Sequence, residues 1–253
     1  MAARHPYLDH DGPIAFAHRG GTSAAPENTL RAFEHAINLG YRYVETDVHA
    51  SADGRLLAFH DNNLLRTCGE NIEIATNDWS TLSQARIDGT DPIPLLEELL
   101  GSWPEIRINI DCKADTALQP LLDTLRRTNS LDRVCIGSFS DKRLAQVRAA
   151  FGSEVCTSMG PGEVARLVLR SHSRLPVPIS KQALCAQVPL KQGPIPVVTR
   201  ATIATAQSLG IHVHVWTIDD PNEIGRLLDM GVDGVMTDDT VTLKSVYQAR
   251  NVW

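Results

Sequence analysis

A chain of 253 residues, 43% of them hydrophobic and with a net charge of −6, has room for one large α/β domain or two small ones. The acidic balance argues against a nucleic-acid-binding surface, which normally needs a basic patch, but it does not exclude an anionic small-molecule substrate. No run approaches the ~18 consecutive apolar residues of a membrane-spanning helix, so we expect no stable membrane insertion.

The N-terminal sequence MAARHPYLDHDGP lacks the apolar stretch of a signal peptide. Residues 1–12 are expected to form either a mobile tail or a cap at the bottom of the fold. The five cysteines show no CxxC spacing, which argues against zinc binding and against a disulfide framework. A reducing cytoplasm is the simplest location for such a chain.

The stretch from residue 14 to residue 48 predicts a strand, a loop, a helix and a second strand, the order of one parallel β/α unit. The expected ranges are 14–18, 29–39 and 43–48, with Asn28 or Thr29 capping the helix. The chain then leaves this rhythm for an insertion at about 49–92, which contains a turn signal at 51–54 and no clean long helix.

The alternation resumes after residue 92. Strands are expected at 107–111, 134–138, 155–159, 186–188, 212–217 and 234–237, and helices at 95–100, 117–127, 142–151, 163–170, 201–209, 223–229 and 240–250. Eight strands alternating with helices favour a single TIM-type (β/α)8 barrel domain over residues 1–253. An open doubly wound sheet is the alternative, but neither a GxGxxG fingerprint nor a P-loop supports it.

Glu45 and Asp47 lie two residues apart in an expected strand and therefore point to the same face. Two carboxylates on one face repel each other unless a group such as a divalent cation with oxygen ligands holds them. A solvated strand face is the alternative, and it fits poorly because Tyr43, Val44 and Val48 indicate a buried strand.

Asp111 and Lys113 show the same spacing in the next barrel strand. They form either a simple ion pair inside the barrel or, in the functional interpretation, a third metal carboxylate and a cation that faces a phosphate. Arg19 follows the first strand, where parallel α/β folds bind ligands, and its guanidinium suits phosphate.

Short motifs recur in order along the chain: AHRG, PENT, ETDV, FHD, IPLLEELL, NIDCK, SFS, VHVWTIDDP and GVDGVMTD. In this order and spacing they resemble the soluble, bacterial members of the glycerophosphodiester phosphodiesterase family. The resemblance runs from about residue 13 to the C-terminal region and implies a TIM barrel that hydrolyses a phosphodiester.

The resemblance implies that His18 and His60 are the general acid and base, roles that neutral and protonated imidazole fill near pH 7. It implies one divalent metal ion, Mg²⁺ or Ca²⁺ with Mn²⁺ as a further choice, held by Glu45, Asp47 and Asp111. The family usually has Glu where Asp111 stands, and the shorter side chain leaves the identity of the metal open.

Three further residues are interpreted from their place in these motifs. Glu27 orders the His18–Arg19 loop, contacts the metal or a hydroxyl, or is a plain acid at a helix N-terminus. Trp216 either stacks against a glycerol or lipid face or fills the barrel. Asp238 is expected to hydrogen-bond a loop.

The leading function is the metal-dependent cleavage of deacylated phospholipids, a small-molecule substrate, into glycerol 3-phosphate and an alcohol. A lysophospholipase D-type reaction is the alternative and needs an apolar groove, for which the insertion offers only scattered apolar residues. A non-catalytic phosphate-binding barrel is disfavoured because both histidines and all three carboxylates occur together. The head group and the oligomeric state stay open.

Overall fold

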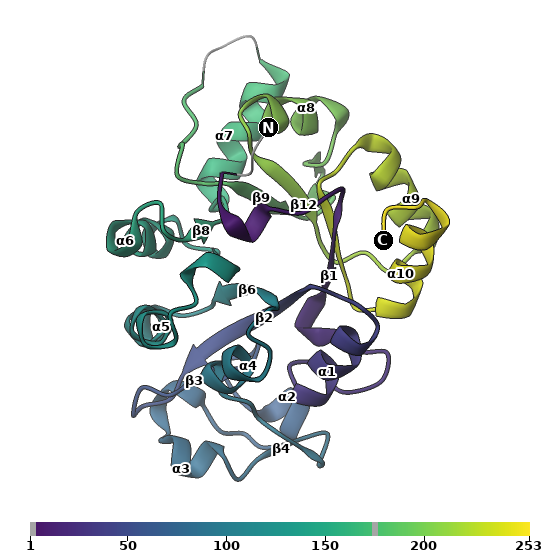
Figure 1. Cartoon of the computed structure of the whole chain (residues 1–253). Helices are drawn as coiled ribbons and strands as arrows, with labels where there is room; N and C mark the ends of the chain where they lie inside the picture. The colour runs from purple at the N-terminus through teal and green to yellow at the C-terminus, as the bar shows by residue number, and fades with distance from the viewer. Residues whose placement is uncertain (1–3, 174–176) are drawn as a thin grey trace.

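Eight parallel strands form a ring in the computed structural model, which describes residues 4–173 and 177–253 (Figure 1). Their order around the ring is β8-β7-β6-β2-β1-β13-β12-β9. The bounds are β1 Ile14–Ala17, β2 Tyr43–Ala50, β6 Arg107–Cys112, β7 Val134–Gly137, β8 Cys156–Thr157, β9 Cys185–Val188, β12 His212–Val215 and β13 Gly234–Thr237.

The ring closes between β8 and β9. An isolated parallel bridge joins Ser158 to Cys185, the amide of Met159 donates to the carbonyl of Cys185 at 2.8 Å, and the amide of Leu184 donates to Thr157 at 3.0 Å. The predicted TIM-type barrel is therefore confirmed, and the open doubly wound sheet is wrong.

Helices surround the ring (Figure 1). They are α1 Leu30–Asn38, α4 Leu96–Ser102, α5 Asp115–Thr128, α6 Asp141–Phe151, α7 Pro161–His172, α8 Arg200–Ser208, α9 Pro221–Met230 and α10 Thr240–Ala249. The largest apolar cluster packs strand residues such as Val44 and Ile110 against helix residues such as Phe33 and Leu121. In the ranges that the structure describes, none of the helices combines the length and the apolar character needed to cross a membrane.

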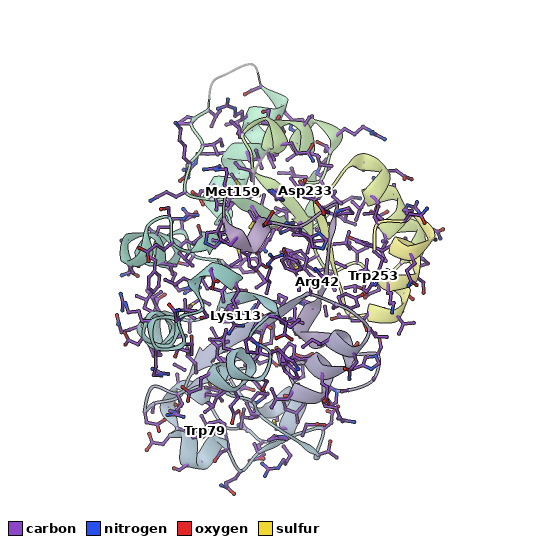
Figure 2. The ribbon with its side chains drawn as sticks, viewed as in Figure 1. Arg42, Trp79, Lys113, Met159, Asp233 and Trp253 are labelled. Atoms are coloured by element: carbon purple, nitrogen blue, oxygen red, sulfur yellow. The ribbon has the colours of Figure 1, made fainter. Side chains whose placement is uncertain are left out.

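The insertion leaves the ring after β2. Strand β3, Leu56–Ala58, turns back antiparallel to β2, and the short helices α2 Leu65–Cys68, η3 Ile74–Thr76 and α3 Trp79–Leu82 follow. A hairpin of β4, Arg86–Ile87, and β5, Asp91–Pro92, ends the insertion. Figure 2 places Trp79 on this outer lobe, whose apolar side chains form a core of their own.

Residues ahead of β1 cap the bottom of the barrel. They form the 3-10 helix η1, Pro6–Leu8, in which Tyr7 and Leu8 are fully or almost fully buried. His5 Nδ1 accepts a hydrogen bond from the amide of Tyr7 at 3.1 Å. Of the two predictions for this segment, the cap is confirmed from residue 5 on and the tail is wrong; residues 1–3 lie outside the described ranges.

Several predicted boundaries differ from the structure by one or more residues, and two of the differences have a clear cause. The strand expected at 155–159 has two ladder residues, because Ser158 already makes only an isolated bridge. Helix α5 begins at Asp115, whose charge suits a helix N-terminus, so Pro120 is inside the helix rather than in its first turn. The remaining short elements are η2 His18–Gly20, η4 Leu131–Arg133, β10 Lys191–Gln192 and β11 Ile195–Pro196.

Candidate active site

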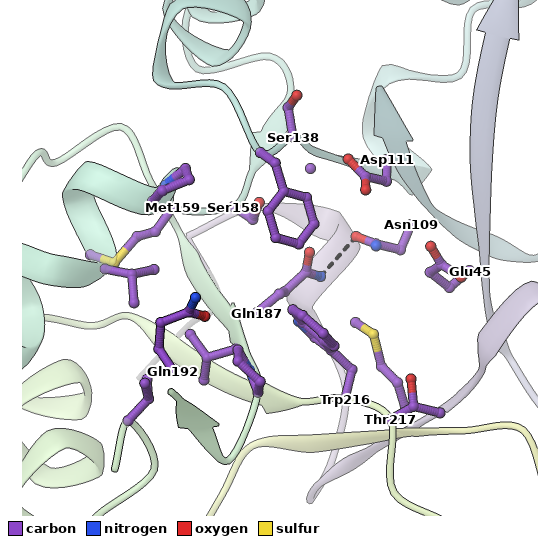
Figure 3. Close-up of a pocket in the computed structure, with 18 of the residues that line it drawn as sticks. Glu45, Asn109, Asp111, Ser138, Ser158, Met159, Gln187, Gln192, Trp216 and Thr217 are labelled. Atoms are coloured by element: carbon purple, nitrogen blue, oxygen red, sulfur yellow. Dashed lines mark hydrogen bonds between the residues drawn. The ribbon is translucent and has the colours of Figure 1, made fainter. Parts of the chain in front are cut away.

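A cavity of about 980 Å³ opens at the carboxyl ends of the barrel strands (Figure 3). It brings together all the predicted catalytic, substrate-binding and metal-binding side chains, from five separate stretches of the chain. These are His18, Arg19, Glu45, Asp47, His60, Asp111, Lys113 and Trp216. Glu27 is the one predicted site residue outside the lining, and it contacts Arg19 from behind.

His18 is held on both sides by carboxylates. Its Nδ1 lies 2.7 Å from Oδ1 of Asp238, and its Nε2 lies 3.8 Å from Oε2 of Glu45. Burial lowers the pKa of His18, but the charge of Glu45 and the hydrogen bond to Asp238 outweigh burial, so the pKa is raised overall. The imidazolium is thereby stabilised.

The backbone after His18 explains the glycine of the motif. Arg19 lies in the left-handed region with φ of 52°, and Gly20 follows with φ of 84°. A Cβ on Gly20 would lie 2.9 Å from both Cβ of Ala32 and the amide nitrogen of Phe33. Only glycine lets this loop pack directly on α1 while it presents His18 and Arg19 to the cavity.

His60 mirrors His18 in its contacts. Its Nδ1 lies 2.5 Å from Oδ1 of Asp61, and Oδ2 of Asp61 accepts a hydrogen bond from Nε of Arg66 at 2.6 Å. Burial opposes ionisation of Asp61, but the hydrogen bonds from Arg66 and His60 lower its pKa to about 2. His18 and His60 therefore each have an aspartate on Nδ1, which leaves Nε2 as the nitrogen for proton transfer.

The strand carboxylates are almost completely buried and surround two cations. Asp47 lies 3.0 Å from Nε of Arg19 and 2.8 Å from Nζ of Lys113. Lys113 also contacts Asp111 at 2.8 Å, so it lies between two carboxylates. The simple pairing of Asp111 with Lys113 is thus present, but as part of a larger charged cluster that faces the cavity.

Two observations fit a bound divalent cation. Oδ1 of Asp111 is buried and has no hydrogen-bond partner in the described part of the chain. Burial, followed by the charge of Asp47, raises the pKa of Glu45 to about 7, so its carboxylate lacks sufficient compensation from Arg19 and Lys113. Carboxylate oxygens are the donors that Mg²⁺ and Ca²⁺ prefer, and a cation would relieve both defects.

Glu45 gives the metal-free protein a specific pH dependence. Because its folded pKa is raised from 4.5 to about 7, its stability contribution is complete below about pH 4.5 and is lost as the pH rises through about 7. We expect the free energy of unfolding of wild type, relative to Glu45→Gln, to fall by on the order of 3 kcal/mol across this window. Urea titrations of both proteins in the presence of chelator, repeated across this pH range, measure the difference. Free energies of unfolding that change in parallel with pH in the two proteins would contradict the prediction.

Asp61, Arg66 and Asp238 complete the site by positioning the two histidines, a role that was not predicted for any of them. Arg66 Nη2 donates to Oε1 of Glu27 at 2.6 Å and thereby ties the insertion to the His18–Arg19 loop. The position of Asp61 beside His60 was a usable signal. No sequence pattern indicated a role for Arg66, which lies in a helix of only four residues.

An apolar wall forms the other half of the cavity. Phe139, Leu169 and Ile195 are 64%, 55% and 55% exposed and all face this space. The wall comes from the loop after β7, from α7 and from the β10–β11 hairpin. The scattered apolar residues of the insertion take no part in this wall, because residues such as Leu64 are buried in the core of the insertion itself.

The floor and one side of the cavity are polar and aromatic. A side-chain hydrogen bond links β9 to β6 across the barrel: Gln187 Nε2 donates to Oδ1 of Asn109 at 2.7 Å (Figure 3). Trp216 packs against the barrel core on one side and lines the cavity on the other, with its ring centroid 5.9 Å from that of Phe139. One face of Trp216 therefore fills the barrel, and the other is open to the cavity, where stacking on a ligand stays a prediction.

Comparisons with known proteins agree with this geometry. Residues 18–242 match the model of the glycerophosphoryl diester phosphodiesterase family. A probable glycerophosphodiester phosphodiesterase 2 of Mycobacterium tuberculosis is 38% identical over 98% of this chain and 95% of its own. Lysophospholipase D of Rattus norvegicus is 27% identical over 90% and 84%.

Among solved structures, a phosphodiesterase of Oleispira antarctica in complex with the product sn-glycerol-3-phosphate aligns with a TM-score of 0.78. It is 21% identical and the alignment covers 94% of this chain and 97% of that one. The family match over most of the chain, together with the bacterial relative, shows that this protein belongs to the glycerophosphoryl diester phosphodiesterase family of enzymes.

Proposed function

We propose that this enzyme hydrolyses glycerophosphodiesters to glycerol 3-phosphate and an alcohol, with His18 and His60 as the acid–base pair and one divalent metal ion. The observation that carries the proposal is the pair of imidazoles, each with an aspartate on Nδ1, in one cavity with three buried carboxylates. The product bound to the Oleispira antarctica relative supports the choice of substrate.

Glu45, Asp47 and Asp111 would hold the metal. When bound, it supplies positive charge for the phosphate oxygens. Arg19 adds a guanidinium with two directed donors, and Lys113 adds a compact charge. Glu27 acts indirectly, by positioning two arginines. Its Oε1 accepts hydrogen bonds from Nη1 of Arg19 at 3.0 Å and from Nη2 of Arg66 at 2.6 Å.

Cleavage requires one proton to leave the attacking hydroxyl and one to reach the departing alkoxide. The raised pKa of His18 suits the acid, which enters the reaction protonated and gives its Nε2 proton to the alcohol oxygen as the P–O bond breaks. His60 is then the base that removes the proton of the attacking hydroxyl, which belongs to water or to the glycerol itself.

Metal removal tests the proposal. We expect enzyme stripped with chelator to release no measurable glycerol 3-phosphate from glycerophosphocholine, and Mg²⁺, Ca²⁺ or Mn²⁺ to restore turnover. Asp111→Asn should need a higher concentration of the same ion for half-maximal rate. Full turnover in excess chelator would contradict the metal requirement while leaving the reaction itself in place.

The apolar wall favours lysophospholipids as a second class of substrate. A deacylated substrate has no group for the exposed side chains of Leu169 and Ile195, whereas one acyl chain would cover them. The rat relative that is named a lysophospholipase D supports this choice. The product would then be lysophosphatidate, with the same two histidines moving the protons.

A negative charge introduced into the apolar wall should affect the two classes of substrate differently. We expect Leu169→Asp to raise KM for lysophosphatidylcholine at least tenfold, since each buried CH₂ contributes about 0.8 kcal/mol, and to leave glycerophosphocholine turnover unchanged. Leu65→Asp is the matched control, because Leu65 is 53% exposed on the insertion and does not line the cavity. An equal rise in KM for lysophosphatidylcholine in both variants would contradict the interpretation that the apolar wall binds an acyl chain.

A further inference from the structure

Three cysteines from consecutive strands of the ring meet inside the barrel. Cys135 on β7, Cys156 on β8 and Cys185 on β9 are completely buried, and their Sγ atoms all lie within 4.8 Å of one another. The Sγ atoms of Cys135 and Cys185 are 3.6 Å apart, too far for a disulfide and within contact distance. The sequence showed no metal-binding spacing because the three residues come from different strands.

His214 lies beside this thiol cluster, on strand β12 next to β9. It is completely buried, and neither of its ring nitrogens has a hydrogen-bond partner among the residues described. Strand β12 pairs with β9, which carries Cys185, and the ring centroid of His214 lies 4.9 Å from that of Phe16, a residue of the same packed cluster as the three cysteines. A buried nitrogen without a hydrogen-bond partner destabilises the folded protein by about 1–3 kcal/mol. A ligand bound to His214 would remove this cost.

Tyr7 approaches the same point from the N-terminal cap. Its hydroxyl is buried and also lacks a partner within the described ranges. Tyr7 belongs to the same packed cluster of buried side chains as the three cysteines. Cysteine packing alone, as small apolar side chains, explains neither Tyr7 nor His214.

The cluster is separate from the active site. Residues two apart on a strand share a face, and Gly137, Ser158, Gln187 and Trp216 line the active-site cavity. Each stands two positions after one of the four cluster residues. The cysteines and His214 therefore form the layer directly beneath the cavity floor and do not line the cavity.

We propose that Cys135, Cys156, Cys185 and His214 bind one structural Zn²⁺ ion inside the barrel. Three thiolates and one imidazole are a recurrent donor set for structural zinc. Tetrahedral coordination with Zn–S bonds of about 2.3 Å places sulfur atoms about 3.8 Å apart, a separation that the cluster already approximates. Tyr7 would donate its free O–H to a thiolate as an outer-shell partner.

Zinc here would join the strands where the ring is weakest. Strand β8 has two residues and meets β9 through one isolated bridge, and the four ligands come from β7, β8, β9 and β12. Binding releases the thiol protons to solvent and involves no change of oxidation state. Because the site is fully buried beneath Tyr7 and Leu8, the ion must enter while the barrel folds or while the cap is displaced.

Metal content of the intact protein tests the proposal. Protein produced with added zinc and dialysed against chelator, which strips the open active site, should retain about one zinc ion per chain. Refolding with Co²⁺ in place of zinc should give a near-ultraviolet thiolate-to-cobalt charge-transfer band, which carboxylate sites cannot produce. Both signals should persist in Glu45→Gln, because Glu45 lines the active-site cavity and is not one of the four proposed zinc ligands.

Cysteine variants locate the site. Cys156→Ser should lose the zinc and the charge-transfer band, and Cys68→Ser, on the insertion away from the cluster, should keep both. Wild-type protein refolded with zinc or cobalt that shows neither a retained ion nor the band overturns the proposal, even if Cys156→Ser fails to fold. A count of three free thiols in the denatured wild-type protein, instead of all five, would show a disulfide and overturn it as well.

Discussion

Replacing His18 or His60 by Gln is expected to lower kcat for glycerophosphocholine by about 10²–10⁴-fold, the usual contribution of a positioned acid or base. Each imidazole has one nitrogen held by an aspartate and the other left for the substrate, so Gln keeps the size of the group and removes the proton transfer. The measurement is glycerol 3-phosphate release at saturating substrate and metal.

The leaving group distinguishes the two histidines. A phosphodiester with a nitrophenolate leaving group needs little help from an acid, so it should recover most of the rate lost in His18→Gln and little of that lost in His60→Gln. His35→Gln, on α1 outside the cavity lining, is the control and should keep wild-type rates. Losses of only a few-fold in both cavity variants would exclude acid–base catalysis by this pair.

Asp238 should act on the same rate through the pKa of His18. The hydrogen bond from Asp238 raises that pKa, so Asp238→Asn is expected to lower it. If His18 must be protonated, the alkaline limb of the kcat–pH profile then moves to lower pH. A uniform loss at every pH would instead indicate that Asp238 only positions the ring.

The parts of the site that lie within one strand were predictable because strand geometry has a fixed period. Glu45 and Asp47 share a face of β2, Lys113 keeps the spacing from Asp111 one residue beyond the end of β6, and both pairs line the cavity. The motif order then supplied His60, which no local pattern connects to His18.

The contacts that orient the site could not be predicted from the sequence, because they form only when the barrel closes. Asp238 reaches His18 across 220 residues of sequence, and the cysteine cluster exists only because β7, β8 and β9 are neighbours in the ring. The apolar wall could not be predicted either, because it comes from the loop after β7, from α7 and from the β10–β11 hairpin, which only the fold brings together. The scattered apolar residues of the insertion pack into a core of their own.

Removing Arg148 is expected to destabilise the protein by about 3–5 kcal/mol, the largest loss of stability that we predict for a residue outside the active site. Arg148 on α6 is only 8% exposed, and its guanidinium donates to both carboxylate oxygens of Glu163 at 2.9 Å. It also donates to the carbonyl of Ser158 at 2.8 Å and to Oγ1 of Thr157 at 2.9 Å. Arg148→Ala would leave the buried charge of Glu163 without compensation.

An exposed pair of the same shape shows that burial, rather than ion pairing, sets this cost. Arg226 also donates to both oxygens of a glutamate, Glu223, at 2.8 and 2.6 Å, but its side chain is 50% exposed. Arg226→Ala should therefore cost less than about 1 kcal/mol in the same urea titration. The double variant Arg148→Met/Glu163→Leu should recover much of the loss, because it removes the uncompensated charge together with its partner. If Arg148→Ala cost no more than Arg226→Ala, the link from α6 to the closing strand and α7 would contribute little to the barrel.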